Sequence, residues 1–148
     1  MGIVKNTQKK LHQILANVNC EWASTYNERG EGERAVRAAN RALRYAPEMV
    51  EAYINRGVGY TNAHDYERAI EDFDTALELR PGDPNALTRR GLAYYYSGDF
   101  AGAIYDYNLA IFKDPKHTLA YLYRGLAEYG QNNMQAALQD YSAAIRCD

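Results

Sequence analysis

Small and apolar residues recur along this chain at the three- and four-residue spacing of one helix face. One such face consists of Tyr53, Gly57 and Tyr60. A second face follows the polar turn NAHD and consists of Ala69, Phe73, Ala76 and Leu77. The second pattern stops at Pro81, because proline cannot continue the hydrogen-bond ladder of a helix. The pattern predicts a pair of helices joined by a short polar turn.

The helix-pair pattern repeats along the chain at a fixed interval. The stretch NRGVGY returns as RRGLAY and YRGLAEY, which places glycines at Gly57, Gly91 and Gly125 and prolines at Pro47, Pro81 and Pro115. An internal period of this length is typical of helical repeat arrays. We divide the chain into four blocks, 16–49, 50–83, 84–117 and an incomplete 118–148, and expect a single domain over 16–148.

The repeat resembles the tetratricopeptide repeat, whose 34-residue pattern is W-x2-L-G-x2-Y, then A-x3-F, then P. The third block matches it at Gly91, Tyr94, Ala103, Tyr107, Ala110 and Pro115. The resemblance implies an all-α fold, a right-handed superhelical array (an α-solenoid) of antiparallel helix pairs with about four repeats. It also implies a concave face, lined by the first helix of each pair, that receives a peptide or helix of a partner protein.

The first block departs from the pattern and is expected to act as a capping repeat. It has Ala23 in the glycine slot and Ala39 in the aromatic slot, while Trp22 lies one residue before Ala23. We expect the Trp22 side chain to fill the volume that Ala39 leaves empty. Residues 1–15 form an N-terminal extension, and the helical spacing of apolar residues within it predicts a long first helix that starts near Lys5.

Arginine and aspartate recur together in the other three blocks. The pairs, which keep one constant spacing, are Arg56 and Asp72, Arg90 and Asp106, and Arg124 and Asp140. The first block lacks both members, which favours a structural ion pair between helices, within one repeat or across to its neighbour. Guanidinium and carboxylate can join through two parallel hydrogen bonds. The alternative is that each arginine lays its stem on apolar surface and keeps its charge in water.

Charge and composition exclude several classes of partner. The formal net charge is -2, with a pI near 5.9, so no broad basic field favours nucleic acid or anionic membranes. No apolar run approaches the roughly 20 residues that cross a bilayer, and the polar start MGIVKNTQKK is not a signal peptide. We expect a cytoplasmic protein that binds neither nucleic acid nor membrane.

The sequence contains no recognisable catalytic or metal-binding constellation. Cys20 and Cys147 are too few for a disulfide framework or a cysteine metal site. His12, His64 and His117 are far apart in polar contexts and are interpreted as surface residues. None of the common zinc-protease, hydrolase or phosphate-loop motifs is present. We therefore expect a non-catalytic protein without cofactor or metal.

The groove-facing slots of the resembled family hold mainly apolar residues here. The residues predicted to contact a partner are Ile54, Val58, Asn62, Thr88, Leu92, Tyr95, Tyr96, Leu122, Leu126 and Tyr129. In one subclass of the family, lysines and asparagines in these slots grip an acidic chaperone C-terminus. Here these gripping slots hold Ile54, Val58, Leu92, Leu122 and Leu126 instead, which favours an apolar or amphipathic partner segment held by aromatic anchors.

Two other functions remain open. The chain stops at Asp148 without a polar capping helix, so Leu138, Tyr141 and Ile145 are predicted to form an uncovered flank that promotes self-association. A homo-oligomeric scaffold is therefore the second hypothesis. The third is a regulatory domain of a larger enzyme or sensor.

Overall fold

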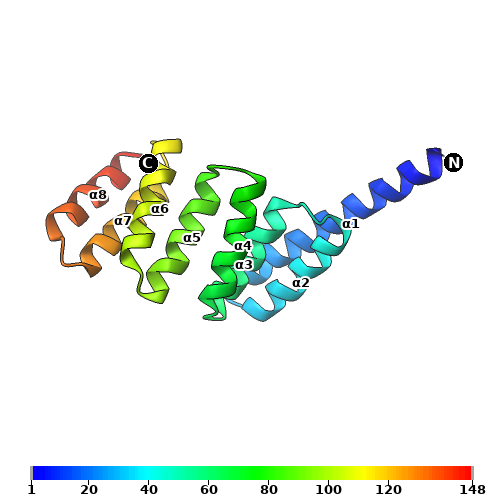
Figure 1. Cartoon of the computed structure of the whole chain (residues 1–148), viewed down its shortest axis with the longest axis horizontal. Coiled ribbons are helices and arrows are strands. Elements are labelled where there is room, and N and C mark those ends of the chain that lie inside the picture. The colour runs from blue at the N-terminus through cyan, green and yellow to red at the C-terminus, as the bar shows by residue number, and fades with distance from the viewer. Residues whose placement is uncertain (1, 148) are drawn as a thin grey trace. The chain divides into compact units, whose positions relative to one another are not determined.

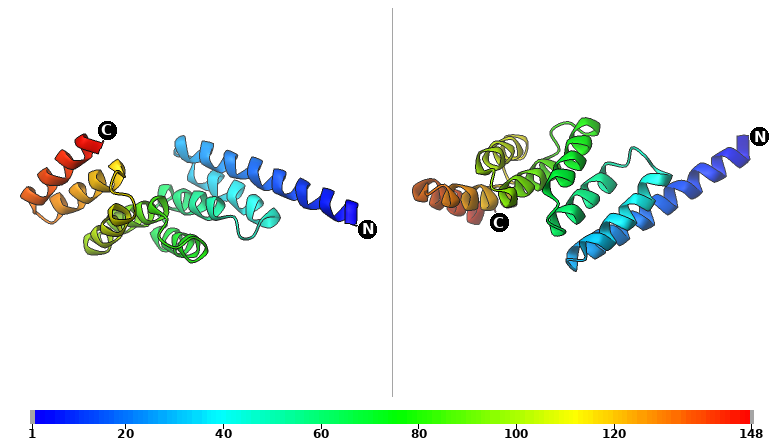
Figure 2. Two further views of the ribbon diagram at one scale, coloured as in Figure 1. Left: turned by 90° about the horizontal axis from the view of Figure 1, so that it is seen from above. Right: turned by 60° about the horizontal axis from the view of Figure 1, so that its bottom comes forward.

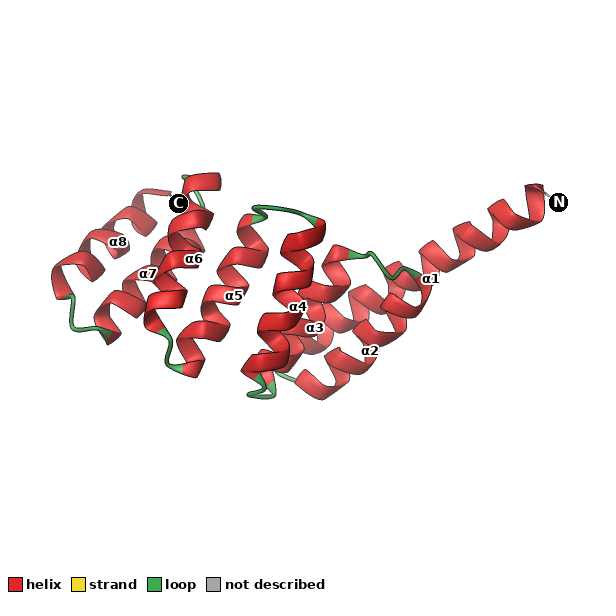
Figure 3. Ribbon diagram, viewed as in Figure 1, coloured by secondary structure: helices red, strands yellow, loops and turns green. Residues whose placement is uncertain are grey.

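The computed structural model describes residues 2–147, and within them every element is a helix (Figures 1 and 3). The helices are α1 (Gly2–Glu28), α2 (Gly32–Tyr45), α3 (Val50–Asn62), α4 (Tyr66–Leu79), α5 (Pro84–Ser97), α6 (Phe100–Lys113), α7 (Thr118–Gly130) and α8 (Met134–Cys147). They form four consecutive pairs, and the helices of each pair pack on one another. The predicted all-α repeat of helix pairs is confirmed.

The helices form two compact units, each with its own internal packing. The first unit runs to Leu79 and contains α1–α4, where α1 packs on both α2 and α3, and α3 packs on α4. The second begins at Arg80 and contains α5–α8, where α6 and α7 are in contact between the two pairs. The proposal of one continuous domain over 16–148 remains a prediction.

The first helix is longer than the others, at 27 residues. It begins at Gly2, earlier than the start near Lys5 that the apolar spacing predicts. Its N-terminal part extends beyond α2, as Figure 2 shows, and side chains 5–14 are all exposed. The C-terminal half of α1 carries the buried residues Ala16, Cys20 and Ala23 that attach it to the first unit.

In each later repeat a glycine of the first helix faces an aromatic ring of the second helix, and the two helices pack closely at that point. A Cβ atom built on Gly91 would lie 2.6 Å from the nearest carbon of the Tyr107 ring, and one on Gly57 would lie 2.7 Å from the Phe73 ring. Phe73 and Tyr107 are both fully buried. The recurrent glycine therefore lets the ring of the second helix reach the backbone of the first.

The two helices of the first repeat pack in a different way. The expectation that Trp22 fills the volume beside Ala39 is wrong. Ala23, Ala38 and Ala39 form a buried cluster, so small residues on both helices meet directly. The large side chain that packs against this cluster is Tyr26, not Trp22. Trp22 instead lies 51% exposed on the outside of α1, where its ring stacks on Tyr26.

The turn inside each helix pair uses one backbone conformation four times. The residues with positive φ, at equivalent positions of the four repeats, are Gly30 (71°), His64 (61°), Gly98 (88°) and Asn132 (64°). Glycine enters this left-handed region freely and asparagine tolerates it, whereas other residues lose about 1–2 kcal/mol there. The turn geometry is thus set by the repeat, and His64 adopts it against its own preference.

His64→Gly is expected to raise the free energy of unfolding by about 1 kcal/mol, because it removes left-handed strain. The gain is reduced by the greater freedom of glycine in the unfolded chain and by loss of the contact from His64 Nδ1 to the Tyr66 hydroxyl, 2.8 Å away. Urea unfolding followed by circular dichroism measures the change. Asn132→Gly is the control and should gain less; equal gains at both sites would contradict the strain argument.

Candidate partner-binding site

The three predicted arginine–aspartate pairs are present as bidentate contacts inside repeats. Arg56 in α3 donates from Nε and Nη2 to the two carboxylate oxygens of Asp72 in α4, at 2.8 and 2.7 Å. Arg90 reaches Asp106 with the same two distances. The planar guanidinium and carboxylate fix the orientation of the two helices as well as their separation.

Arg56 and Arg124 also reach the preceding repeat. The third guanidinium nitrogen of Arg56 donates to the side-chain oxygen of Asn40 in α2, at 2.7 Å. Arg124 bonds in the same way to Asn108 in α6, at 2.6 Å, besides its two bonds to Asp140. Asn40 and Asn108 occupy the same repeat slot, two periods apart. Each of these arginines therefore joins three helices, which neither sequence alternative anticipated.

The aspartates of these pairs are buried, whereas the arginines keep contact with water. The Asp106 side chain is 1% exposed and its partner Arg90 is 19% exposed. In the first unit, burial raises the pKa of the Asp72 carboxyl, while hydrogen bonds from Arg56 oppose that shift. The same hydrogen bonds raise the pKa of Arg56. These groups are fully engaged with one another, so we assign them an architectural role.

The predicted partner-contacting residues of the second unit lie on α5 and α7, which are in contact. On α7, Leu122 is 38% exposed, Leu126 36% and Tyr129 56%. On α5, Leu92 is half-buried and Tyr96 is 55% exposed. These five residues define the α5–α7 surface, which presents apolar and aromatic side chains to solvent.

Other predicted contact residues have different environments. Ile54 and Thr88 are buried, at 6% and 2% exposure, and do not offer a surface to a partner. Tyr95 is half-buried with its ring 5.4 Å from that of Phe100, so it belongs largely to the packing within the second unit. The amphipathic period of a helix cannot separate a groove-facing residue from one covered by its neighbour.

In the first unit, Val58 is half-buried and Asn62 is exposed. The Asn62 amide lies 3.4 Å from the backbone oxygen of Asn27 at the end of α1. A second amide, Asn55, donates to the backbone oxygen of Cys20 at 3.2 Å. The first helices of this unit are thus joined by asparagines on the side where the partner residues were predicted.

The residues predicted to mediate self-association lie on α8. Leu138 is 60% exposed and Ile145 is 77% exposed. Tyr141 is half-buried, because its ring packs on the backbone at Gly125, where an added Cβ would lie 2.7 Å from it. Leu138 and Ile145 therefore present large apolar surface, whereas Tyr141 does not.

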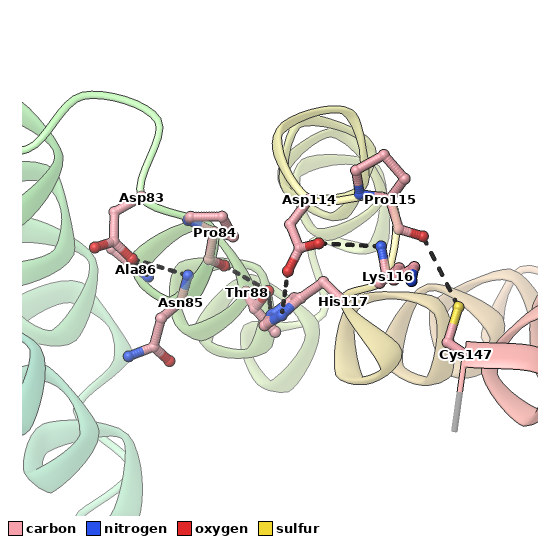
Figure 4. Close-up of polar contacts among 10 residues, drawn as sticks. All are labelled: Asp83, Pro84, Asn85, Ala86, Thr88, Asp114, Pro115, Lys116, His117 and Cys147. Carbon is pink, nitrogen blue, oxygen red and sulfur yellow. Dashed lines mark hydrogen bonds and ion pairs between the residues drawn. The ribbon is translucent and has the colours of Figure 1, made fainter.

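A polar network between α5 and the turn that joins α6 to α7 was missed by the sequence reasoning (Figure 4). His117 Nε2 lies 2.9 Å from the Thr88 hydroxyl, and its Nδ1 lies 3.8 Å from a carboxylate oxygen of Asp114. The Thr88 hydroxyl donates its single proton to the carbonyl of Pro84, so its oxygen accepts from His117. Thr88 is buried and its proton is engaged, so this Asp–His–Thr arrangement joins helices and does not activate a nucleophile. His117 is not the isolated surface residue that the sequence suggests.

Within residues 2–147 the structure groups no three His, Cys, Asp or Glu side chains in a way that could hold a metal ion. None of the helices that it describes is long and apolar enough to span a membrane. Cys20 and Cys147 are both free thiols, and burial raises the pKa of Cys20.

Comparison with known proteins defines the family. The tetratricopeptide repeat model matches residues 20–84, 58–118 and 88–148, which together cover most of the chain. The chain therefore belongs to the tetratricopeptide repeat family, whose members are helical repeat proteins that bind other proteins. No curated protein sequence gives a significant match to the chain.

Solved structures show the same fold at low sequence identity. A crystal structure of MamA superposes with a TM-score of 0.75 at 23% identity, covering 89% of this chain and 77% of that one. The Arabidopsis OM64 TPR domain gives 0.74 at 18% identity, covering 80% and 98%. The second TPR of Spaghetti (RPAP3), solved bound to the HSP90 peptide SRMEEVD, gives 0.64 at 23% identity, covering 69% and 95%.

Proposed function

We propose that the chain is a non-catalytic interaction module whose α5–α7 surface binds an apolar or amphipathic segment of a partner protein. The observation that carries the proposal is the exposure of Leu122, Leu126, Tyr129 and Tyr96 on two helices in contact, with Leu92 beside them. Tyrosines are among the side chains that carry most of the binding energy in protein interfaces, and burial of the leucines beside them removes further apolar area from water. Val58 and Asn62 are proposed to contact a partner within the first unit.

The chemistry of this surface favours an apolar ligand over an acidic one. The HSP90 peptide is the ligand of the RPAP3 domain and carries two glutamates and a terminal aspartate. Binding of such a peptide needs cationic or amide donors in the groove-facing slots. In this chain the corresponding residues on α5 and α7 include Leu92, Leu122 and Leu126. An acidic C-terminal peptide is therefore not the proposed ligand.

Leu92→Glu combined with Leu126→Glu is expected to abolish partner capture, because two carboxylates would be desolvated in an apolar interface. The measurement is an affinity pull-down from native lysate with wild-type and variant protein. Circular dichroism must first show equal helicity. The matched control, Tyr105→Glu with Phe112→Glu, adds the same charge at exposed positions of α6, 63% and 79% exposed. A partner kept by the first variant, or lost equally from both, would refute this assignment.

Self-association through α8 is the second candidate function, and the exposure of Leu138 and Ile145 favours it. Light scattering of the isolated protein distinguishes the two functions. A wild-type oligomer that Leu138→Glu with Ile145→Glu converts to a monomer would support the scaffold function. A role as the regulatory domain of a larger enzyme or sensor is the third proposal, and the full reading frame tests it.

A further inference from the structure

A row of arginines lies along the exposed side of α2 in the first unit. Its members, spaced three, four and three residues apart, are Arg34, Arg37, Arg41 and Arg44. This spacing places them on one side of the helix over about three turns. The opposite side of α2 is built of buried alanines, so the arginines are not needed to attach the helix. We call these four residues the arginine row.

The repeat architecture does not require the arginine row. In the equivalent positions α4 has Arg68, Glu71, Thr75 and Glu78, and α6 has Gly102, Tyr105, Leu109 and Phe112. The second helix of a repeat thus folds with acidic, polar or aromatic residues in these slots. The charge of the row belongs to the first repeat alone.

The row retains positive charge after its local ion pairs are counted. Arg34 pairs with Glu31, at 2.5 Å, and Arg37 pairs with Glu33, at 3.5 Å. The first is a contact with the N-cap residue of α2 and the second lies within the helix; both arginines are exposed, and such surface pairs contribute little energy and exchange readily with other partners. Among the described residues Arg41 and Arg44 form no ion pair. The row can therefore present several guanidinium groups to a ligand.

An apolar row lies on α1 beside the arginine row. Its members are Leu11, Ile14, Val18 and Trp22, with exposures of 52%, 58%, 43% and 51%. Their spacing of three, four and four residues places them on one side of the helix. Four adjacent large apolar side chains, each about half in water, form a continuous patch of the kind that marks an interaction site.

The apolar row and the arginine row are linked through the Tyr26 ring, which contacts a member of each. The Trp22 ring stacks on Tyr26 with centroids 6.0 Å apart, and the Arg34 guanidinium lies 5.1 Å from the centre of the same Tyr26 ring. Tyr26, Ala38 and the first three arginines of the row line a hollow of about 170 Å³. Tyr26 of α1 and the arginine row of α2 therefore line one shallow depression, and Trp22, the last residue of the apolar row, stacks on Tyr26 at its edge.

We propose that this depression binds an acidic amphipathic helix of a partner protein. The apolar row on α1 and the arginine row on α2 each extend over about three helical turns, which is about 15 Å. A ligand helix of about three turns matches that length. Its apolar side would cover the row on α1, and glutamates or aspartates on the adjoining side would meet the guanidiniums of α2.

Other occupants fit the two rows less well. Nucleic acid would contact the arginines but leave three aliphatic side chains of α1 in water. A second copy related by two-fold symmetry would place the same patch on both sides of the contact, so it would supply no acidic row to oppose the arginines. A bilayer is a flat surface and cannot enter a depression between two helices. Each of these occupants is an alternative outcome of the experiment.

The experiment uses the whole chain and three designed peptides, each about four helical turns long, labelled with a fluorophore and measured by anisotropy. The first peptide has leucines at helical spacing on one side and glutamates in the adjoining row. In the second, lysines replace the glutamates; in the third, the glutamates are moved to the side opposite the leucines. We expect only the first to bind with a dissociation constant below about 1 mM, and its affinity to fall with added salt.

Protein variants locate the binding site. Arg37→Glu with Arg41→Glu is expected to weaken binding of the first peptide at least about tenfold, because attraction becomes repulsion. Trp22→Ser should weaken it by a similar factor through the apolar row. The matched control is Lys113→Glu with Lys116→Glu, which changes the net charge equally at exposed positions of the second unit and should alter affinity less than about twofold.

Several results would overturn the proposal. They are failure of the first peptide to bind, equal binding of the lysine or displaced-glutamate peptide, and unchanged affinity in the Arg37, Arg41 variant. Tighter binding of double-stranded DNA or phosphatidylglycerol vesicles than of the first peptide, lost in that same variant, would assign the arginines to another ligand. Dimerisation that depends on Trp22 would assign the apolar row to a second copy. The Leu92, Leu126 variant should bind the peptide normally, so this site and the α5–α7 surface are tested separately.

Discussion

Asp72→Ala is expected to lower the free energy of unfolding by about 3 kcal/mol, the largest single effect that we anticipate for the ion pairs. The substitution removes both acceptors of Arg56 in α4 and leaves the guanidinium with Asn40 and limited water, since its side chain is 23% exposed. Urea unfolding monitored by circular dichroism measures the loss. Hydrogen exchange should locate it in α3 and α4.

The double variant Arg56→Leu with Asp72→Leu is the informative control. Burial raises the pKa of the Asp72 carboxyl even beside Arg56. The attraction between the two charges therefore serves largely to offset the free-energy cost of removing the carboxylate from water. Replacing both charges by apolar groups should therefore lose about 1 kcal/mol or less, well below the single variant. Asn40→Ala removes one hydrogen bond and should lose about 1 kcal/mol. A double variant less stable than Asp72→Ala would show that the pair itself is a major source of stability.

Gly91→Ala is expected to destabilise the protein, although alanine is the better helix former by about 1 kcal/mol. The new methyl carbon would lie 2.6 Å from a ring carbon of Tyr107, which is fully buried and has no space to move into. Overpacking of this kind costs about 1–3 kcal/mol, and a contact this short belongs at the upper end. Thermal and urea unfolding measure the net loss.

A double-mutant cycle tests the cause. Tyr107→Leu removes the ring that the methyl would strike, so Gly91→Ala should become neutral or stabilising in that background, as helix propensity alone predicts. Gly91→Ala destabilising by the same amount in both backgrounds would exclude the ring as the origin. The Tyr107 hydroxyl is buried and forms no hydrogen bond in the described part of the chain, so the leucine leaves no polar partner unsatisfied.

The candidate surface could be predicted only in part. Leu122, Leu126 and Tyr129 share one side of α7 by helical periodicity, and they are exposed. Thr88 fits the same periodicity on α5, yet it is buried against His117. Periodicity says which residues share a face, whereas burial depends on which neighbouring helix covers that face. The network of Thr88 and His117 had no sequence signal, because 29 residues separate its members and nothing in the repeat pattern couples them.

The repeat can be read from the amino-acid sequence without a structure. Its constant period marks where helices begin and end, because proline and turn residues act locally on the backbone. The sequence also favoured the pairing of Arg56 with Asp72, because the arginine and the aspartate appear together in three blocks and are both missing from the first. The recurrence of a glycine in the first helix and an aromatic residue in the second is visible in the sequence, whereas their direct contact is a finding of the structure.

The way in which the first repeat differs depends on packing between its helices. The sequence shows Trp22 in place of an arginine and Ala39 in place of an aromatic ring, and it suggested that one compensates for the other. In the structure the alanines of α1 and α2 meet directly, so Trp22 lies outside and joins Leu11, Ile14 and Val18 beside the arginines of α2. Which side of a helix meets solvent is a property of packing between helices, and that packing has no counterpart in local sequence.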